Sequence, residues 1–255
     1  MSVKLLYTTP LWLISNGIRQ SHNTTNKADS YWLDGMGTEC PYCGSNELEE
    51  SISSYECNTI SICKDCGANL QIHIGEKDYD LIKRVGFHMN HSSVLEHSLI
   101  VFEVKMTTKA LLEESRHRIG VSQTVTSSRY ALDIIDVEFE TIPDPRKEEF
   151  AKKQQKDLLE FIDTFRNEKG RISKKDMDEL AMLLPQNFIY KLQLTFNFRS
   201  LVHFIKLRIN KSAHYTIRKI AFEILKELPP EWQELVLLDE KINKNYKELL
   251  NEYNK

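Results

Sequence analysis

Four of the five cysteines form two Cys-x-x-Cys-Gly turns. Cys40-Pro-Tyr-Cys43-Gly44 and Cys63-Lys-Asp-Cys66-Gly67 are separated by 19 residues. Each turn aims two thiolates at one point, and structural zinc prefers four thiolates in a tetrahedron. The glycine after the second cysteine lets the backbone turn so that its amides face the sulfur atoms. The spacing predicts a closed structural zinc site, with no open position for catalysis, made by Cys40, Cys43, Cys63 and Cys66.

Other uses of these cysteines remain open. A redox dithiol normally stands alone, so the doubled motif disfavours that role, and unpaired core cysteines are a further alternative. Cys57 is interpreted as a bystander, and His73 could replace one ligand. Zinc ribbons also bind nucleic acid or partner proteins, which is a second, less favoured role for this segment.

A second cluster is Ser115-Arg116-His117-Arg118-Ile119-Gly120, followed by Ser127-Ser128-Arg129-Tyr130. Three consecutive cation-capable side chains at a helix end suit an anionic or electron-rich ligand such as a phosphorylated cofactor. The competing interpretation is a solvated basic helix end that interacts with the helix dipole. The residue types alone leave both open.

Three histidines, His88, His91 and His97, lie close together in the sequence. No carboxylate pairs convincingly with them, which disfavours a metal cluster. His97 could instead be a core histidine with its hydrogen bonds satisfied.

Length and composition limit the class of protein. The chain has 255 residues, of which 41% are hydrophobic and 28% charged, which is typical of a globular protein with a real core. A net charge of -3 gives no general basic field for nucleic acid. The apolar runs are too short to span a bilayer, and no secretory signal is recognisable. An odd number of cysteines without an export signal argues against disulfides, so we expect a cytoplasmic protein.

The elements that must position these residues follow from hydrophobic periodicity. Residues 29–75 contain all the cysteines and read as an insertion with its own fold. Strands are predicted at Leu99–Met106 and Phe188–Phe196, and Thr107 or Thr108 can cap a helix that runs to about Arg118. Further helices are predicted over 77–89, 147–166, 174–184, 198–207, 212–228 and 242–253, after a strand-turn-helix opening in 1–28.

Several blocks, in order, resemble the flavin-dependent thymidylate synthases. Arg-His-Arg followed by Ser-x-Arg-Tyr is similar to the signature of that family. Outside the cysteine segment the resemblance covers about residues 1–28 and 75–230. The other matching blocks are His91 to His97, Leu184-Pro185, Asn197 to Leu201 continuing through His203 to Arg208, and, more weakly, Gly17-Ile18-Arg19.

The resemblance implies an α+β fold, a β-sheet flanked by helices, here with a small inserted zinc ribbon. It also implies a reaction: reduced FAD takes a methylene from methylenetetrahydrofolate to carbon 5 of dUMP, hydride completes the methyl group of dTMP, and NADPH re-reduces the flavin. The cofactor would carry out the redox chemistry, while the protein would position the substrates and polarise the uracil ring. The family implies a homotetramer with flavin sites shared between subunits. The catalytic domain would span 1–255, interrupted by the ribbon at 29–75.

The resemblance also implies roles for individual residues. Arg208 and Ser127 would be the catalytic residues, with Arg208 polarising the uracil ring. Ser127, Ser128, Arg129 and Arg208 would bind the nucleotide, whose phosphate Ser127 and Arg129 would hold. The FAD and folate contacts would come from Arg116, His117 and Arg118, with His97, Asn197, Arg199 and His203 lining the flavin site.

Three departures from the family pattern are visible. Eight residues instead of seven separate Arg118 from Ser127, so a bulge or a longer loop must absorb one residue. Val125 stands where an acidic residue is usual. Ala181 stands where a basic residue helps to bind the nucleotide phosphate, and the loss of that contact could cost about 1.5–3 kcal/mol.

Because Ala181 stands where the family has a basic residue, other functions remain open. Lys191, Lys206 or Lys211 could compensate for the missing charge. Otherwise the chain would alkylate carbon 5 of another uridine nucleotide, or would be a non-catalytic homologue that binds nucleotide or nucleic acid.

Overall fold

A computed structural model describes residues 1–32, 45–52, 59–65, 72–127 and 137–253. The largest sheet in these residues has the order β1-β6-β8-β7, and every neighbouring pair is antiparallel. Its strands are β1 (Ser2–Thr8), β6 (Leu99–Thr107), β7 (Val121–Val125) and β8 (Ile189–Asn197). This confirms an α+β fold with a β-sheet flanked by helices.

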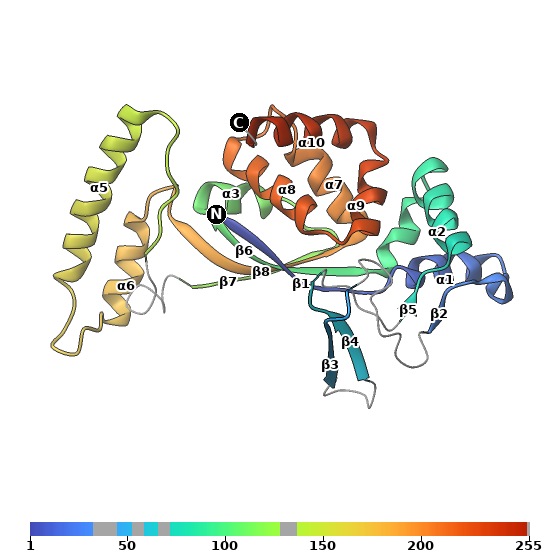
Figure 1. Ribbon diagram of the computed structural model, residues 1–255. Coiled ribbons are helices and arrows are strands. Elements are labelled where there is room, and N and C mark those ends of the chain that lie inside the picture. Colours follow the sequence, from blue (N-terminus) through green and yellow to red (C-terminus); the bar gives the residue numbers. More distant parts are fainter. Residues whose placement is uncertain (33–44, 53–58, 66–71, 128–136, 254–255) are drawn as a thin grey trace.

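The two central strands build the core because their side chains alternate between the two faces of the sheet. Ile100, Phe102, Val104 and Met106 of β6 are fully buried, as are Leu194 and Phe196 of β8. These side chains belong to the main hydrophobic cluster, together with residues of the helices that cover one face of the sheet (Figure 1). The opposite face carries charged pairs such as Lys191–Glu103.

Three helices cover this core: α3 (Thr108–Glu114), α7 (Phe198–Arg208) and α8 (Tyr215–Glu227). Two of them begin directly where a strand ends, because a side-chain oxygen caps the first turn. Thr107 Oγ1 accepts from the Ala110 amide and Asn197 Oδ1 accepts from the Ser200 amide. The caps bring the ends of β6 and β8 directly into the helices that carry the candidate residues.

The sheet is extended at one end by α1 (Trp12–Ser21) and α2 (Glu76–Ile82), which pack together (Figure 1). A buried ion pair joins them: Arg19 Nε lies 2.5 Å from Asp78 Oδ1. Burial favours the neutral form of Asp78, but hydrogen bonds from Ser30 and Arg19 outweigh it, so the pKa of Asp78 is lowered. Arg19, from the weakest of the resembling blocks, therefore has a structural partner.

At the other end, α5 (Pro145–Asp163) and α6 (Lys174–Leu180) form an arm that stands apart from the sheet (Figure 1). The arm has a small hydrophobic cluster of its own, formed by Ile162, Ile172, Met177 and Leu180. Ala181, at the start of the following turn, packs against this cluster.

The inserted segment is described in part. β2 (Tyr31–Trp32) pairs with β5 (Ile72–His73), which brings the ends of the insertion together. Between them β3 (Leu48–Ile52) and β4 (Thr59–Cys63) form an antiparallel pair. The remaining elements are η1 (Thr25–Lys27), η2 (Lys83–His88), η3 (Ser92–His97), η4 (Ala181–Leu183), α9 (Pro230–Leu237) and α10 (Glu240–Tyr253).

Most predicted elements are present, and the differences are local. The helix after Thr107 ends at Glu114, so Arg116 to Arg118 lie beyond it. The segment between Gly120 and Ser127, for which no element was predicted, contains β7, in which Ser122 pairs with Thr195. In the described part of the chain, no helix combines the length and apolar character needed to cross a bilayer.

Candidate active site

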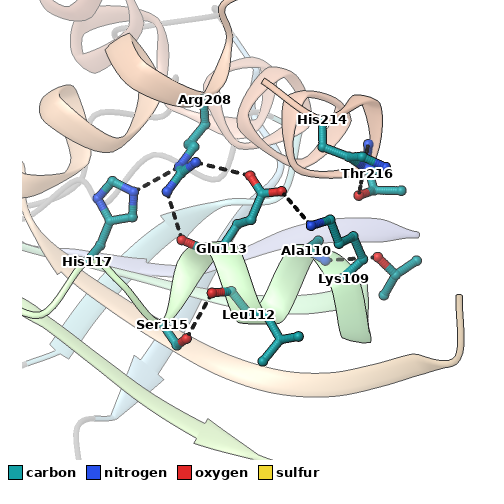
Figure 2. A network of polar contacts seen from close by, with 10 residues as sticks. Lys109, Ala110, Leu112, Glu113, Ser115, His117, Arg208, His214 and Thr216 are labelled. Atoms are coloured by element: carbon teal, nitrogen blue, oxygen red, sulfur yellow. Dashed lines mark hydrogen bonds and ion pairs between the residues drawn. The ribbon is translucent and has the colours of Figure 1, made fainter. Parts of the chain in front are cut away.

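Arg208, the last residue of α7, is held in place by α3 and the segment after it (Figure 2). Its Nη1 donates to Glu113 Oε2 at 3.0 Å, and its Nη2 donates to the Glu113 carbonyl oxygen at 2.9 Å. Its Nε donates to His117 Nε2 at 3.0 Å. The Arg208 and Glu113 side chains are only 17% and 11% exposed, so the guanidinium is well ordered by a nearly buried partner.

Glu113 was not singled out in the sequence, although its spacing contained a signal. It lies four residues after Lys109, and residues at this spacing share one helix face.

His117 is held in its neutral form. Its Nε2 accepts from Arg208, so the ring proton must be on Nδ1. Burial, together with the charges of Arg208 and His203, lowers the pKa of His117 to about 4. His117 therefore acts as a neutral hydrogen-bonding group near neutral pH and contributes no positive charge.

Glu114 is a second carboxylate on α3, and it is fully buried. Neither of its carboxylate oxygens has a hydrogen-bond partner among the described residues. Burial raises the pKa of Glu114 to about 7, against an opposing effect of Arg208. The folded protein thus keeps this group protonated at pH values where the unfolded chain has lost the proton.

Replacement of Glu114 by glutamine is expected to raise stability above pH 7 by about 1–3 kcal/mol, because it removes the free-energy cost of ionising a buried acid. Since the pKa is raised on folding, the wild type should lose stability as pH rises from about 4.5 to about 7. Urea unfolding at pH 5 and pH 8 measures this. An equal change in the free energy of unfolding at both pH values would contradict a raised pKa of Glu114.

A cavity of about 1180 Å³ opens beside His117. Its walls come from η2, η3, the segment after α3, α7 and the start of α10. Of the predicted cofactor residues, those that line it are Arg116, His117, Arg118, Arg199 and His203.

The cavity fits a phosphorylated cofactor with a flat apolar part. Arg116 and Arg118 are exposed, and neither contacts a carboxylate in the described part of the chain. Ile119, beside them, is 86% exposed, which is unusual for a large apolar side chain. Two exposed guanidinium groups next to apolar surface are suited to the pyrophosphate and ring system of FAD.

Asn197, which the resemblance placed at the flavin site, caps α7, and its backbone amide donates to Gly120 O at 2.8 Å. Gly120 has a φ of +65°, and a Cβ there would lie 2.2 Å from Asn197 Nδ2. Ser200 Oγ also donates to Ile119 O at 2.7 Å. Asn197 and Ser200 thus fix the turn after Arg118, and Asn197 is absent from the cavity wall.

The remaining predicted flavin residues are exposed. Arg199 donates to Glu96 Oε1 at 2.5 Å. The His203 ring lies 6.0 Å from that of His117, edge to face. His97 packs so closely on Gly17 that a Cβ there would lie 2.8 Å from the ring, and it is not part of the cavity wall.

Ser127 lies two residues beyond the end of β7, whereas Arg118 precedes its start. The five residues of the strand span roughly 16 Å at about 3.3 Å per residue. A single chain therefore does not bring Ser127 to the cavity beside Arg116. Ser128 and Arg129 lie outside the described residues.

The three lysines considered as substitutes for a basic residue at 181 are each paired with a carboxylate. Lys191 contacts Glu103, Lys206 contacts Asp239 and Lys211 contacts Glu248. Of these, Lys206 lines the cavity beside His117.

Of the four predicted zinc ligands, Cys63 is described: it ends β4 and is buried. Cys40, Cys43 and Cys66 lie outside the described residues, as does Cys57. The described part of the chain contains no group of three or more potential ligands.

The fold is similar to that of solved structures. The crystal structure of thymidylate synthase X from Helicobacter pylori with FAD and dUMP matches with a TM-score of 0.67 and 23% identity, covering 95% of this chain and 99% of that one. A second structure of the flavin-dependent enzyme from the same species, complexed with FAD and dUMP, gives 0.64 and 24%. This chain thus has the fold of the flavin-dependent thymidylate synthases.

The amino-acid sequence agrees with the fold. The family described as thymidylate synthase complementing protein (Thy1) matches residues 43–232. The flavin-dependent thymidylate synthase of Wolinella succinogenes is 33% identical over 177 residues, covering 65% of this chain and 84% of the relative. That of Campylobacter jejuni strain RM1221 is 36% identical over 173 residues, covering 66% and 80%. The chain belongs to the family of flavin-dependent thymidylate synthases.

Proposed function

We propose that the chain is an FAD-dependent thymidylate synthase that converts dUMP to dTMP with methylenetetrahydrofolate as the carbon donor and NADPH as the reductant. The observation that carries this proposal is Arg208, fixed by Glu113 and His117 next to a cavity lined by Arg116 and Arg118, which have no carboxylate partner among the described residues. The curated relatives and the H. pylori structures with FAD and dUMP support it.

When bound, FAD supplies the redox chemistry of the reaction. Arg116 and Arg118 would bind its phosphates, and His203 and Arg199 would contact it from α7. Arg208 has five N–H donors, of which Glu113 and His117 use one on each nitrogen, leaving one each on Nη1 and Nη2. These two can stabilise negative charge that develops on the uracil ring.

An anaerobic assay with FAD, NADPH, methylenetetrahydrofolate and dUMP, read by mass spectrometry, tests the proposal. Formation of dTMP supports it. Bound FAD without dTMP favours the second candidate, which Ala181 motivates: carbon-5 alkylation of another uridine nucleotide. A protein that binds neither FAD nor dUMP would contradict both.

A homotetramer with shared sites is part of the proposal, because Ser127 and Arg116 lie at opposite ends of β7. Arg116→Ala and Ser127→Ala chains should each be inactive. Co-expressed in equal amounts, they should regain about a quarter of wild-type activity, because each site draws its two segments from different chains. The double variant mixed with either single variant is the control, and it should stay inactive. No recovery in the first mixture would contradict a shared site.

The segment 29–75 is proposed as a zinc ribbon inserted into the catalytic domain 1–255. The pairing of β2 with β5 at the ends of the insertion and the antiparallel pair that ends at Cys63 support this. Purified protein should contain about one zinc per chain by elemental analysis, and Cys63→Ser should lose it, since thiolate ligands hold the metal. Cys57→Ser is the matched control and should keep its zinc. Equal zinc in both variants would contradict the ligand set.

A further inference from the structure

A second cavity, of about 980 Å³, lies where the arm meets the body of the protein. Its walls come from the start of α3, the first turns of α5, the segment 183–187 and the start of α8. None of the residues assigned so far to flavin or nucleotide lines it.

The charged residues of this cavity are mainly cationic. Lys109, Arg146 and Lys147 line it, against the single carboxylate of Asp144. Asp144 already caps α5 and lies 3.5 Å from Arg146 Nη2 and 3.7 Å from Lys147 Nζ. Phe150 adds apolar wall. A positive excess beside apolar surface suits a phosphorylated organic ligand.

Lys109 connects this cavity to Arg208 through Glu113 (Figure 2). Lys109 Nζ lies 3.5 Å from Glu113 Oε1, while Arg208 Nη1 lies 3.0 Å from Glu113 Oε2. The two cations are therefore separated by one carboxylate group. A mononucleotide has a similar division, because one sugar separates its base from its phosphate.

Lys109 is also fixed next to the segment that lacks a basic residue. Its backbone amide donates to Gln186 O at 3.0 Å, two residues after Leu184. Ala181 itself packs against the hydrophobic cluster of the arm, which explains an apolar residue there. Lys109 thus brings a positive charge, from a different element, to the segment that follows Ala181.

We propose that Lys109 binds the 5′-phosphate of the nucleotide substrate, in place of a basic residue at 181, while Arg208 contacts its base. This rests on the proposed function and specifies the phosphate end of that site. Arg146 and Lys147 add positive charge around the phosphate.

Calorimetric titration of the FAD-loaded protein with dUMP and with deoxyuridine, which lacks the phosphate, tests the assignment. Lys109→Met should raise the dissociation constant for dUMP about tenfold, since it removes one charge-assisted contact, and leave that for deoxyuridine unchanged. Lys109→Arg should restore most of the dUMP affinity. Lys156→Met, which also removes a lysine paired with a glutamate four residues further on, is the matched control and should bind dUMP as the wild type does.

The outcomes distinguish the role of Lys109 from the proposed function of the protein. If wild type binds dUMP and Lys109→Met binds it equally well, the role of Lys109 is overturned while the proposed function stands. An equal loss of dUMP and deoxyuridine affinity would also overturn it, because the effect would then not depend on the phosphate. Wild type that binds neither compound contradicts the proposed function itself.

Discussion

Replacement of Arg208 by alanine is expected to lower the turnover number by about 100- to 1000-fold, because it removes a pre-oriented donor to charge that builds up on the uracil ring. FAD should remain bound, since the Arg116 and Arg118 side chains that would hold it are unchanged. Single-turnover kinetics and flavin absorbance measure the two effects. Arg171→Ala, which removes an exposed arginine of the arm, is the control and should retain wild-type turnover.

A second variant separates chemistry from folding. Arg208→Ala leaves Glu113 nearly buried without its guanidinium, which could lower stability. Glu113→Gln keeps an acceptor for Arg208 but removes the negative charge. It should be folded and turn over more slowly than wild type but faster than Arg208→Ala. Wild-type turnover in Arg208→Ala would refute the role given to Arg208.

The second large effect concerns stability. Arg19→Met is expected to destabilise the fold by about 3–5 kcal/mol, because it leaves the Asp78 carboxylate, whose side chain is 1% exposed, without its cation. Denaturant unfolding measures the loss. Lys83→Met, which breaks the more exposed Lys83–Glu234 pair, is the control and should cost at most about 1 kcal/mol.

The pH dependence gives an independent check on this pair. The pKa of Asp78 is lowered on folding, so its contribution is present above the pKa of the unfolded chain and is lost as pH falls through the folded value. The difference in stability between wild type and Arg19→Met should therefore shrink in acid. A difference that stays constant down to the acid transition would mean that the Asp78 charge does not matter.

The sequence predicts the central strands and their helices well, because Leu99–Thr107 and Ile189–Asn197 alternate and end at good helix caps. β7 was missed: Val-Ser-Gln-Thr-Val has apolar residues only at its ends, and its pairing with β8 is a tertiary effect.

The family resemblance indicated Arg116, His117, Arg118, Arg199 and His203, and the structure places these five side chains around one cavity. Sequence could not indicate that Glu113 contacts both Lys109 and Arg208, because these contacts depend on the direction in which α3 leaves β6. Nor could it distinguish a helix cap from a cavity residue, which is the difference at Asn197.

The turn at Gly120 has a consequence for how this site can vary in length. Asn197 and Ser200 fix the turn on its Arg118 side, and β7 pairs with β8 from Val121 to Val125 without a shift in register. The additional residue before Ser127 is therefore not absorbed as a bulge inside the strand. The part of the signature before β7 and the part after it are thus joined by a strand of fixed length and register.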